Sequence, residues 1–445
     1  MNTKISPISR RDFLRLAGTS TLAAAAFAQG LPTFQVGAQG GYTAPAGDIT
    51  ATLSTYNFGD AKSQVVYKAA IARFNQRYPN VKVEDNYFPI PNGDWAQYIT
   101  QYKTRVASGL APDILAMAIE GARLATSSGL LMPLDEMIGA DPNGKKAFVD
   151  GVNPVLDNAL KYQNKTYFIT REWNNMMIHY NTQMFKAAGL ATPSLTWTWD
   201  DFLAAAKKLT TGEGATKVYG FGIPFFNFGL QPWFYTNSTS QLTADWTASN
   251  LNDPKVLEAV KFVHSLIHEH GVAPAVEGTD QNSLFAANRV AMTGAGHWTV
   301  SQWADNKVPM DVTNWPRKTA ATTVFGSGGW GIGAQSANPK LAWELLKDLA
   351  NLATDKEIAK LGGSIPAREE ATKIPEFQQF PPSAVLFYDS LKDIKPVPAP
   401  ANFAEVQDIF MRHMSAIMSN QVTPEQGLAD AHTELSDAMA KLKES

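Results

Sequence analysis

The sequence predicts an α/β fold with more than one lobe. Short strand-like segments alternate with longer segments whose apolar residues recur at helical spacing, and this alternation favours a largely parallel sheet. The chain has 445 residues, 44% of them hydrophobic, so it can bury more than one core. Because no disordered linker separates two sequential domains, we expect lobes that interleave along the chain.

Strands and helices alternate regularly after the first 48 residues. Ile49–Ser54 alternates apolar and polar residues, as a half-buried strand does. The helix predicted over Val65–Tyr78 ends at Pro79, which cannot continue it. A strand, a helix closed by Gly109 and a short buried strand follow in chain order: Val81–Asp85, Trp95–Ala107 and Asp113–Met117.

The rest of the chain continues this pattern. A helix begins at Trp199, with Thr198 or Asp200 as its N-cap, because either side chain can accept hydrogen bonds from the first free N–H groups. The other predicted strands are Thr166–Thr170, Met176–Tyr180 and Val290–Thr293. The other predicted helices are Pro254–His268, Leu341–Leu352, Phe403–Met418 and Pro424–Lys441.

The amino terminus carries an export signal. The pair Arg10-Arg11 precedes the alanine-rich apolar run Leu16–Ala28, followed by small residues suited to cleavage. We expect residues 1–38 to form this signal, with cleavage after Ala28 or Ala38. The paired arginines are typical of the twin-arginine route, which exports folded proteins. No later apolar run approaches the roughly 20 residues of a membrane span.

Charge and cysteine content exclude several functions. The net charge is −3 and there is no basic block, so we expect no nucleic-acid partner. The chain has no cysteine, which excludes disulfides, iron–sulfur clusters, thiolate zinc sites and a lipid-modified cysteine. An exported protein without disulfides must rely on the packing of its core.

Three motifs suggest a cofactor or metal but fit poorly. Gly326–Gly331 matches the dinucleotide glycine fingerprint, yet an extended segment follows it where a helix is required, so we expect a glycine-rich turn. Gly139–Lys146 approaches a phosphate-binding loop but lacks its Ser or Thr. His264, His268 and His270 stand at a helix end, where they complement exposed carbonyl groups. We expect no cofactor and no metal.

Aromatic and polar residues gather at the ends of predicted strands. Four tryptophans adjoin glycine or small polar residues instead of lying in apolar helical stripes: Trp173, Trp233, Trp298 and Trp330. One of them lies within the hydrogen-bonding run Arg171–Asn175. A sugar ring needs a flat aromatic face for its C–H surface and planar polar groups for its hydroxyls. This set predicts a carbohydrate-binding cleft.

Several phrases of the sequence recur in one known family. They are Phe74–Val83, Ser108–Ile114 with Ser128–Asp135, Tyr180–Leu190 with Thr196–Phe202, and Phe285–Met292 followed by Trp298. Asn288 stands where the family usually has glycine. In this order and spacing the phrases resemble the family 1 extracellular solute-binding proteins of ABC importers, the maltose-binding type. The resemblance covers nearly all of the chain after the signal.

The resemblance implies two interleaved α/β lobes joined by hinge strands, the type II-like architecture of periplasmic binding proteins. Lobe 1 would comprise residues 47–170 plus 326–380, and lobe 2 residues 171–325 plus 381–445. Closure over a ligand would couple binding to docking on a transporter. The implied partners are a sugar and the membrane permease subunits of an ABC importer. We expect a monomer in the periplasm or at the extracellular face of the membrane.

The resemblance also implies most of the ligand contacts. Asp60 and Glu120 would supply hydrogen bonds from the first lobe, and Trp298 would stack from the second; Trp233 rests on the residue pattern alone. The expected ligand-binding residues are Asp60, Glu120, Glu172, Trp173, Asn174, Trp233, Trp298, Trp330, Arg368 and Phe403.

Two other functions stay open from the sequence. One is an exported carbohydrate-active enzyme, a lyase or hydrolase, because catalytic carboxylates pair in space and not in sequence. The other is a metal or anion receptor. The aromatic supply favours a carbohydrate, and an oligosaccharide among carbohydrates, while the few basic candidates, Arg171 and Arg368, disfavour a highly phosphorylated ligand. We expect binding without catalysis.

Overall fold

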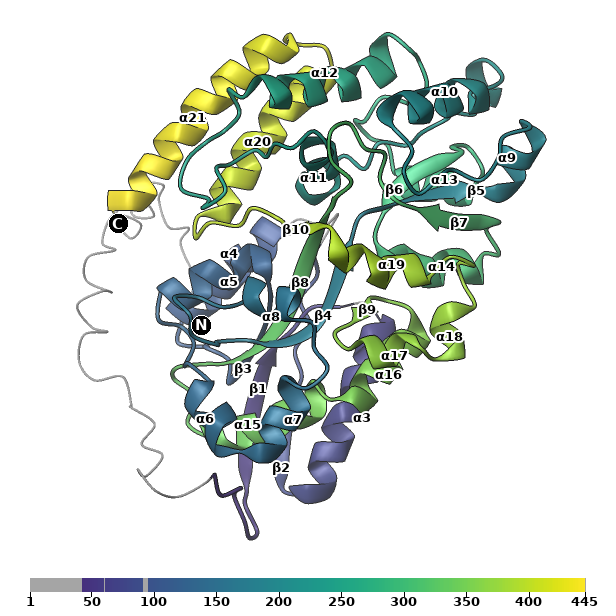
Figure 1. Cartoon of the computed structure of the whole chain (residues 1–445). Coiled ribbons are helices and arrows are strands. Elements are labelled where there is room, and N and C mark those ends of the chain that lie inside the picture. Colours follow the sequence, from purple (N-terminus) through teal and green to yellow (C-terminus); the bar gives the residue numbers. More distant parts are fainter. Residues whose placement is uncertain (1–41, 60, 91–94, 445) are drawn as a thin grey trace, which may run out of the picture. The chain divides into compact units, whose positions relative to one another are not determined.

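The computed structural model describes residues 42–59, 61–90 and 95–444. Residues 44–445 form one compact unit. The predicted export signal and its cleavage sites lie outside the described residues. Within this unit the strands form two sheets (Figure 1).

The larger sheet has seven strands in the order β2-β1-β3-β8-β4-β9, with β10 paired to β8. The first three are parallel to one another, as is β10 to β8, whereas β8 runs antiparallel to β3 and β4, and β9 antiparallel to β4. Their bounds are β1 Ala51–Tyr56, β2 Val81–Glu84, β3 Ile114–Ala118, β4 Ile169–Asn175, β8 Thr323–Ile332, β9 Ile365–Pro366 and β10 Ile394–Pro396.

The smaller sheet has β5 (Met177–Asn181) between β6 (Met292–Ala295) and β7 (Met310–Thr313), and both pairings are antiparallel. The α/β prediction is confirmed, but the prediction of a largely parallel sheet is wrong. The chain passes from the larger sheet to the smaller one along β4, which leads into β5, and it returns along β8, which follows β7. The neighbouring strands β4 and β8 therefore run in opposite directions (Figure 1).

A single buried hydrophobic cluster contains residues from both sheets. Trp173 of β4 and Phe325 of β8 belong to it, together with Met177 of β5 and Val312 of β7. All four side chains are almost fully buried. The strands that connect the sheets are therefore themselves part of the core.

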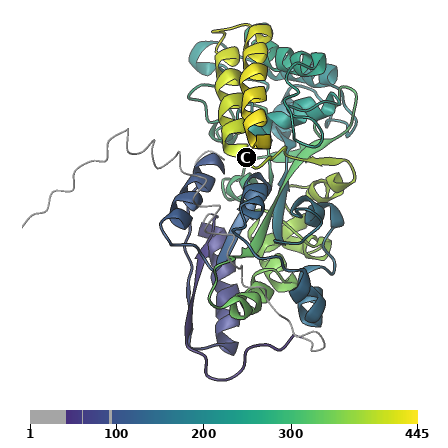
Figure 2. The ribbon, with the colours of Figure 1, turned by 90° about the vertical axis from the view of Figure 1, so that its left-hand side faces the viewer.

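Helices cover the sheets. The longer helices are α3 Ala61–Arg77, α4 Trp95–Ala107, α5 Ile119–Ser127, α10 Trp199–Leu209, α11 Asn227–Thr236, α12 Pro254–His268, α15 Pro339–Leu349, α16 Leu352–Leu361, α20 Phe403–Met418 and α21 Pro424–Glu444. The shorter ones are α6 Asp135–Ala140, α7 Pro142–Phe148, α8 Pro154–Ala159, α9 Thr182–Ala187, η2 Gly214–Thr216, α13 Gln281–Ala286, η3 His297–Thr299, α14 Val300–Asp305, α17 Glu369–Thr372, α18 Pro375–Gln378, α19 Val385–Asp389 and η4 Ser390–Lys392. Figure 2 shows α20 and α21 side by side at the carboxyl terminus.

Local sequence signals account for several helix ends. Thr198 is the N-cap of α10 and forms a capping box with Asp201, so of the two predicted caps the structure uses Thr198. The bounds of α4 are those predicted. The helix predicted over 341–352 instead ends at Leu349, and α16 begins anew because Asn351 caps it by accepting from the Thr354 N–H.

The glycine-rich segment Gly326–Gly331 lies within β8, so the predicted turn is wrong. Its glycines let neighbouring groups approach the strand closely. A Cβ on Gly329 would lie 2.7 Å from the Phe168 Cβ, and one on Gly331 would lie 3.0 Å from the Tyr167 carbonyl oxygen. The glycines serve strand packing here, and no helix follows them to hold a dinucleotide.

Candidate ligand-binding cleft

A cavity of about 430 Å3 lies beside the strands that connect the two sheets. Phe58 and Glu120 reach it from the carboxyl ends of β1 and β3, which are parallel neighbours, and this is the edge where α/β sheets bind ligands. Other lining residues come from α3, α4, β4, α11, η3, β8 and α20. The cavity is lined by Phe58, Gly59, Ser63, Ile90, Trp95, Ala118, Glu120, Glu172, Trp173, Asn174, Phe226, Phe228, Trp298, Gly326, Ser327, Gly328, Gly363, Ser364, Phe403 and Gln407.

One of the two lining carboxylates is fully engaged. Glu172 accepts from the Arg171 Nε–H at 2.9 Å through Oε1, and from the hydroxyls of Tyr67 at 3.2 Å and Ser364 at 3.0 Å through Oε2. The Arg171 guanidinium carbon also lies 4.1 Å from the ring centroid of Phe58. The charge of Glu172 is therefore compensated from behind the cavity wall.

The other lining carboxylate has no such compensation. Glu120 stands in the first turn of α5, is only 4% exposed, and its Oε2 has no hydrogen-bond partner among the described residues. Burial raises the pKa of Glu120 to about 7, against a smaller lowering by its own backbone N–H. A buried polar atom without a partner is costly, so this oxygen is available to a ligand.

Two further polar side chains complete the wall on β8 and β4. Ser327 is fully buried, and its Oγ has no hydrogen-bond partner in the described part of the chain. Asn174 uses its Oδ1 to accept from the His297 backbone N–H at 3.0 Å, which fixes the orientation of its amide. The cavity thus offers hydroxyl, amide and carboxyl groups along one side.

Aromatic rings form the rest of the wall. Phe58 and Trp95 meet edge to face with their centroids 4.9 Å apart, on the side of the larger sheet. Trp298 faces Phe226 and Phe228 at 6.4 and 6.2 Å, on the side of the smaller sheet. The Trp298 ring lies against Gly296, where a Cβ would come within 2.0 Å of it, so the glycine makes this ring position possible. Flat apolar faces therefore enclose the cavity from two sides.

The structure places six of the sequence-predicted site residues together around this cavity. They are Glu120, Glu172, Trp173, Asn174, Trp298 and Phe403. Asp60 lies outside the described residues. Contact of these side chains with a ligand stays a prediction.

Two of the predicted tryptophans lie elsewhere. Trp233 of α11 is fully buried in an aromatic cluster, with its ring centroid 5.7 Å from Trp199 and 5.1 Å from Trp315. Trp330 of β8 is fully buried against Tyr67, with centroids 5.1 Å apart, and lies beneath the Arg171 guanidinium. Neither lines the cavity, because neighbouring side chains bury both rings.

Arg368 also lies away from the cavity. Its guanidinium pairs with Asp355 at 2.7 Å and donates to the backbone carbonyls of Asp150 and Ala147. The side chain is buried. Arg368 therefore joins α16 to α7 and the turn after it, and it does not line the cavity.

Sequence reasoning missed most of the aromatic wall and four polar side chains. The missed lining residues with aromatic or hydrogen-bonding side chains are Phe58, Ser63, Trp95, Phe226, Phe228, Ser327, Ser364 and Gln407. A signal existed for some of them, because Phe58 lies four residues after the predicted strand Ile49–Ser54, and the run Pro224–Phe228 contains three phenylalanines. Gln407 sits one turn beyond Phe403 on α20 and carries no comparable signal.

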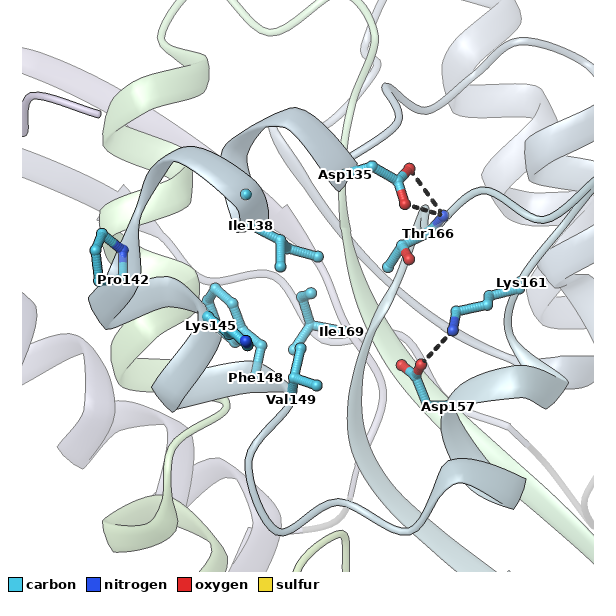
Figure 3. A pocket seen from close by; sticks show the side chains of 11 residues that line it. Asp135, Ile138, Pro142, Lys145, Phe148, Val149, Asp157, Lys161, Thr166 and Ile169 are labelled. Carbon is cyan, nitrogen blue, oxygen red and sulfur yellow. Dashed lines mark hydrogen bonds and ion pairs between the residues drawn. The ribbon is translucent and has the colours of Figure 1, made fainter. Parts of the chain in front are cut away.

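A second pocket, of about 500 Å3, lies among α6, α7 and α8 and the start of β4 (Figure 3). Its floor is apolar, with Ile138, Phe148 and Ile169. Asp135 accepts from the Thr166 N–H, and Lys161 pairs with Asp157 at 2.8 Å. Figure 3 shows both pairs at its edge.

The family profile of bacterial extracellular solute-binding proteins matches residues 60–355, more than half of the chain. The chain belongs to this family. The resemblance seen in the sequence is thereby confirmed at the level of the family. An uncharacterised ABC transporter extracellular-binding protein of Pyrococcus horikoshii is 24% identical over 441 residues, which cover 91% of this chain and 92% of the relative.

Solved structures of solute-binding proteins have the same fold. An ABC substrate-binding protein of Listeria monocytogenes in complex with cycloalternan superposes with a TM-score of 0.79 at 22% identity, over 88% of this chain and all of the other. A maltose/maltodextrin-binding domain of Bdellovibrio bacteriovorus bound to maltotriose gives 0.73 at 18% identity, over 87% and 100%. The predicted periplasmic-binding-protein architecture is therefore confirmed.

The family places this solute-binding protein outside the cytoplasmic membrane, in the periplasm or at the cell exterior. Among the described residues, no helix combines the length and apolarity needed to cross a bilayer. In a solute-binding protein the cavity beside β4 and β8 is the place where a small molecule would be held.

Proposed function

We propose that this solute-binding protein captures a carbohydrate, in the first place an oligosaccharide, and delivers it to the permease subunits of an ABC importer. Residues 47–170 plus 326–380 would form one lobe and residues 171–325 plus 381–445 the other, with the ligand held between them. The closed form would bind the ligand more tightly than the open form, so ligand binding would shift the protein toward closure. The transporter would then distinguish the loaded, closed protein from the empty one.

The observation that carries this proposal is the composition of the cavity wall. Aromatic rings, including Trp298 and Trp95, line the same cavity as the hydrogen-bonding groups of Glu120, Ser327 and Asn174. A sugar presents C–H faces and equatorial hydroxyls, which need this combination. The two solved relatives described above were crystallised with cycloalternan and maltotriose, which agrees with the proposal.

The proposed role is binding without chemistry. A retaining or inverting glycosidase needs two carboxyl groups that are free to act as acid and as base or nucleophile. Here Glu172 has both carboxylate oxygens engaged by Arg171, Tyr67 and Ser364. Recovery of unchanged sugar after prolonged saturation is the expected result, and conversion of the sugar would favour the enzyme alternative.

The proposed route to the cell exterior is twin-arginine export directed by residues 1–38. The protein is proposed to act as a monomer, with no nucleic-acid partner because the chain is acidic. Replacing Arg10 and Arg11 by lysine should leave the protein in the cytoplasm. Export that is unaffected by this change would contradict the route but not the binding function.

A thermal-shift screen tests the binding function. Mono- and oligosaccharides that bind the native state should raise its melting temperature. At a ligand concentration about one hundred times Kd, binding stabilises the native state by about 2.7 kcal/mol. Trp298→Ala, which removes one aromatic face, should reduce the shift for the sugar that gives the largest effect. A screen in which zinc gives a shift and no sugar does would replace this proposal with a metal receptor.

A further inference from the structure

The charged side chains that line the cleft, among the described residues, are all acidic. The described lining residues include two carboxyl groups, Glu120 and Glu172, and no lysine, arginine or histidine. Position 60 and positions 91–94, which the structure does not describe, carry no basic residue either. An anionic ligand would therefore find no cation on the wall to pair with.

The cations nearest to the wall are already engaged. Arg171 donates to Asn57 Oδ1 at 2.6 Å, to the Phe58 carbonyl at 3.1 Å and to Glu172. Aromatic rings cover its guanidinium group, and the side chain is 1% exposed. Turning this group toward a ligand would break all of these contacts at once.

Two more cations follow the lining segments in the chain, and both have partners elsewhere. Lys62 forms an ion pair with Asp305 of α14 at 3.0 Å. Arg123 of α5 lies over the ring of Trp246, with its guanidinium carbon 4.2 Å from the centroid. Neither Lys62 nor Arg123 is among the lining residues of the cavity, and their partners Asp305 and Trp246 do not line it either.

Glu120 is the lining charge that lacks compensation. Arg171 neutralises Glu172, whereas Oε2 of Glu120 is buried without a hydrogen-bond partner in the described chain. Phe228 lies near the same point of β8, since a Cβ on Gly326 would be 3.8 Å from both Glu120 Oε1 and Phe228 Cζ. An unpaired carboxyl group among aromatic rings favours a hydroxyl or a protonated amine and repels an anion.

We propose that the cleft selects sugars by charge: it accepts neutral and amine-bearing sugars and rejects sugar acids and sugar phosphates, with Glu120 as the residue that sets this preference. The inference rests on the proposed function and names the class of carbohydrate for the same site. Like charges brought together in a desolvated site oppose binding strongly, and the described lining residues include no lysine, arginine or histidine to offset this.

Calorimetric titration with three matched ligands tests the inference. They are a neutral oligosaccharide selected by the thermal screen, the same sugar with one hydroxymethyl group oxidised to a carboxylate, and the same sugar with one hydroxyl replaced by an amine. At pH 7.5 we expect the acid to bind at least about 100-fold more weakly than the neutral sugar, and the amine to bind at least as tightly as it.

Glu120→Gln keeps the size of the side chain, removes its charge and replaces one acceptor oxygen by an N–H donor. In this variant the penalty on the acid should shrink about tenfold, and any advantage of the amine should disappear. Asp157→Asn is the matched control, because it changes the net charge of the protein by the same amount at the edge of the second pocket. It should leave all three affinities unchanged.

The outcomes separate the two proposals. If the neutral sugar binds and the acid binds equally well, the charge inference is wrong while the sugar-binding function stands. The inference is also wrong if Asp157→Asn alters the preference as much as Glu120→Gln does. If no sugar of any charge binds, the proposed function is wrong and this inference falls with it.

Discussion

The two pockets of this molecule have similar volumes and opposite chemistry. The cleft encloses about 430 Å3 and the pocket among α6, α7 and α8 about 500 Å3. In the second pocket Asp135 and Asp157 are paired with neighbouring groups, and Phe148 is the one aromatic residue of its described lining. In the cleft, Glu120 and Ser327 carry unpaired buried oxygens beside many aromatic rings. Unsatisfied polar groups and flat apolar faces therefore identify a binding site better than volume does.

The largest expected effect concerns Glu120 and the pH dependence of stability. Its folded pKa of about 7 lies above the ordinary value of 4.5, so the folded state binds this proton more tightly than the unfolded state does. Stability from this group is therefore fully present below about pH 4.5 and is lost as pH rises to 7. Above pH 7, Glu120→Gln should be more stable than the natural protein by about 3 kcal/mol in urea unfolding, whereas near pH 4.5 the difference should vanish.

The stability difference between the natural protein and Glu120→Gln separates the effect of Glu120 from that of other titrating groups. Burial lowers the pKa of His179 and of His297 to about 3, so both destabilise the fold as pH falls below their ordinary value of 6.5. This effect is common to both proteins and cancels in the difference. A stability difference that does not change between pH 4.5 and 7.5 would mean that the carboxyl of Glu120 is not desolvated.

The second prediction compares the walls of the two pockets. Trp298→Ala should weaken sugar binding by about 1–3 kcal/mol in calorimetry, because it removes an aromatic face from the cleft. Val149→Ala shortens a half-exposed side chain at the second pocket and should leave the affinity unchanged. Unchanged affinity in Trp298→Ala would remove this ring from the site.

The third prediction uses the unpaired hydroxyl on β8. Ser327→Ala should weaken sugar binding by about 0.5–1.5 kcal/mol, the usual value of one hydrogen bond. The free protein should not lose stability, because this Oγ has no partner in the described chain. Calorimetry and urea unfolding measured together would check both. A clear loss of stability without a loss of affinity would show that Ser327 serves the fold.

The smallest effect is expected at the edge of the second pocket. Lys161→Ala removes the partially exposed ion pair with Asp157, for which surface pairs on one helical turn suggest about 0–1 kcal/mol of stability. Sugar affinity should stay the same. Altered affinity would indicate that the second pocket communicates with the cleft, and the contrast between the two pockets would then need revision.

Much of the fold was predictable because local signals are strong. The bounds of α4 and the N-cap of α10 followed from helical spacing and from Thr198. The sheet was not predictable to the same extent. Whether β8 lies parallel or antiparallel to its neighbours depends on where the chain returns from the smaller sheet, and no local pattern encodes that path.

The candidate site shows the same division. Trp298 and Trp330 both lie within two residues of a glycine, yet one lines the cavity and the other is covered by Tyr67 and Arg171. Arg368 was predicted from the sequence as a ligand contact, but its guanidinium forms an ion pair with Asp355. Local composition says that a residue is suited to a ligand, but the neighbours contributed by distant segments decide whether it is free to meet one.

The sequence by itself determined the family, the α/β class and the aromatic and polar residue types, because periodicity, capping and family phrases are properties of contiguous residues. Only the tertiary structure decided which of these residues face the cleft. It also decided that Glu172 is neutralised by Arg171 while Glu120 is not. The physical reason is that burial and charge compensation arise from groups far apart in the chain, so no segment carries them alone.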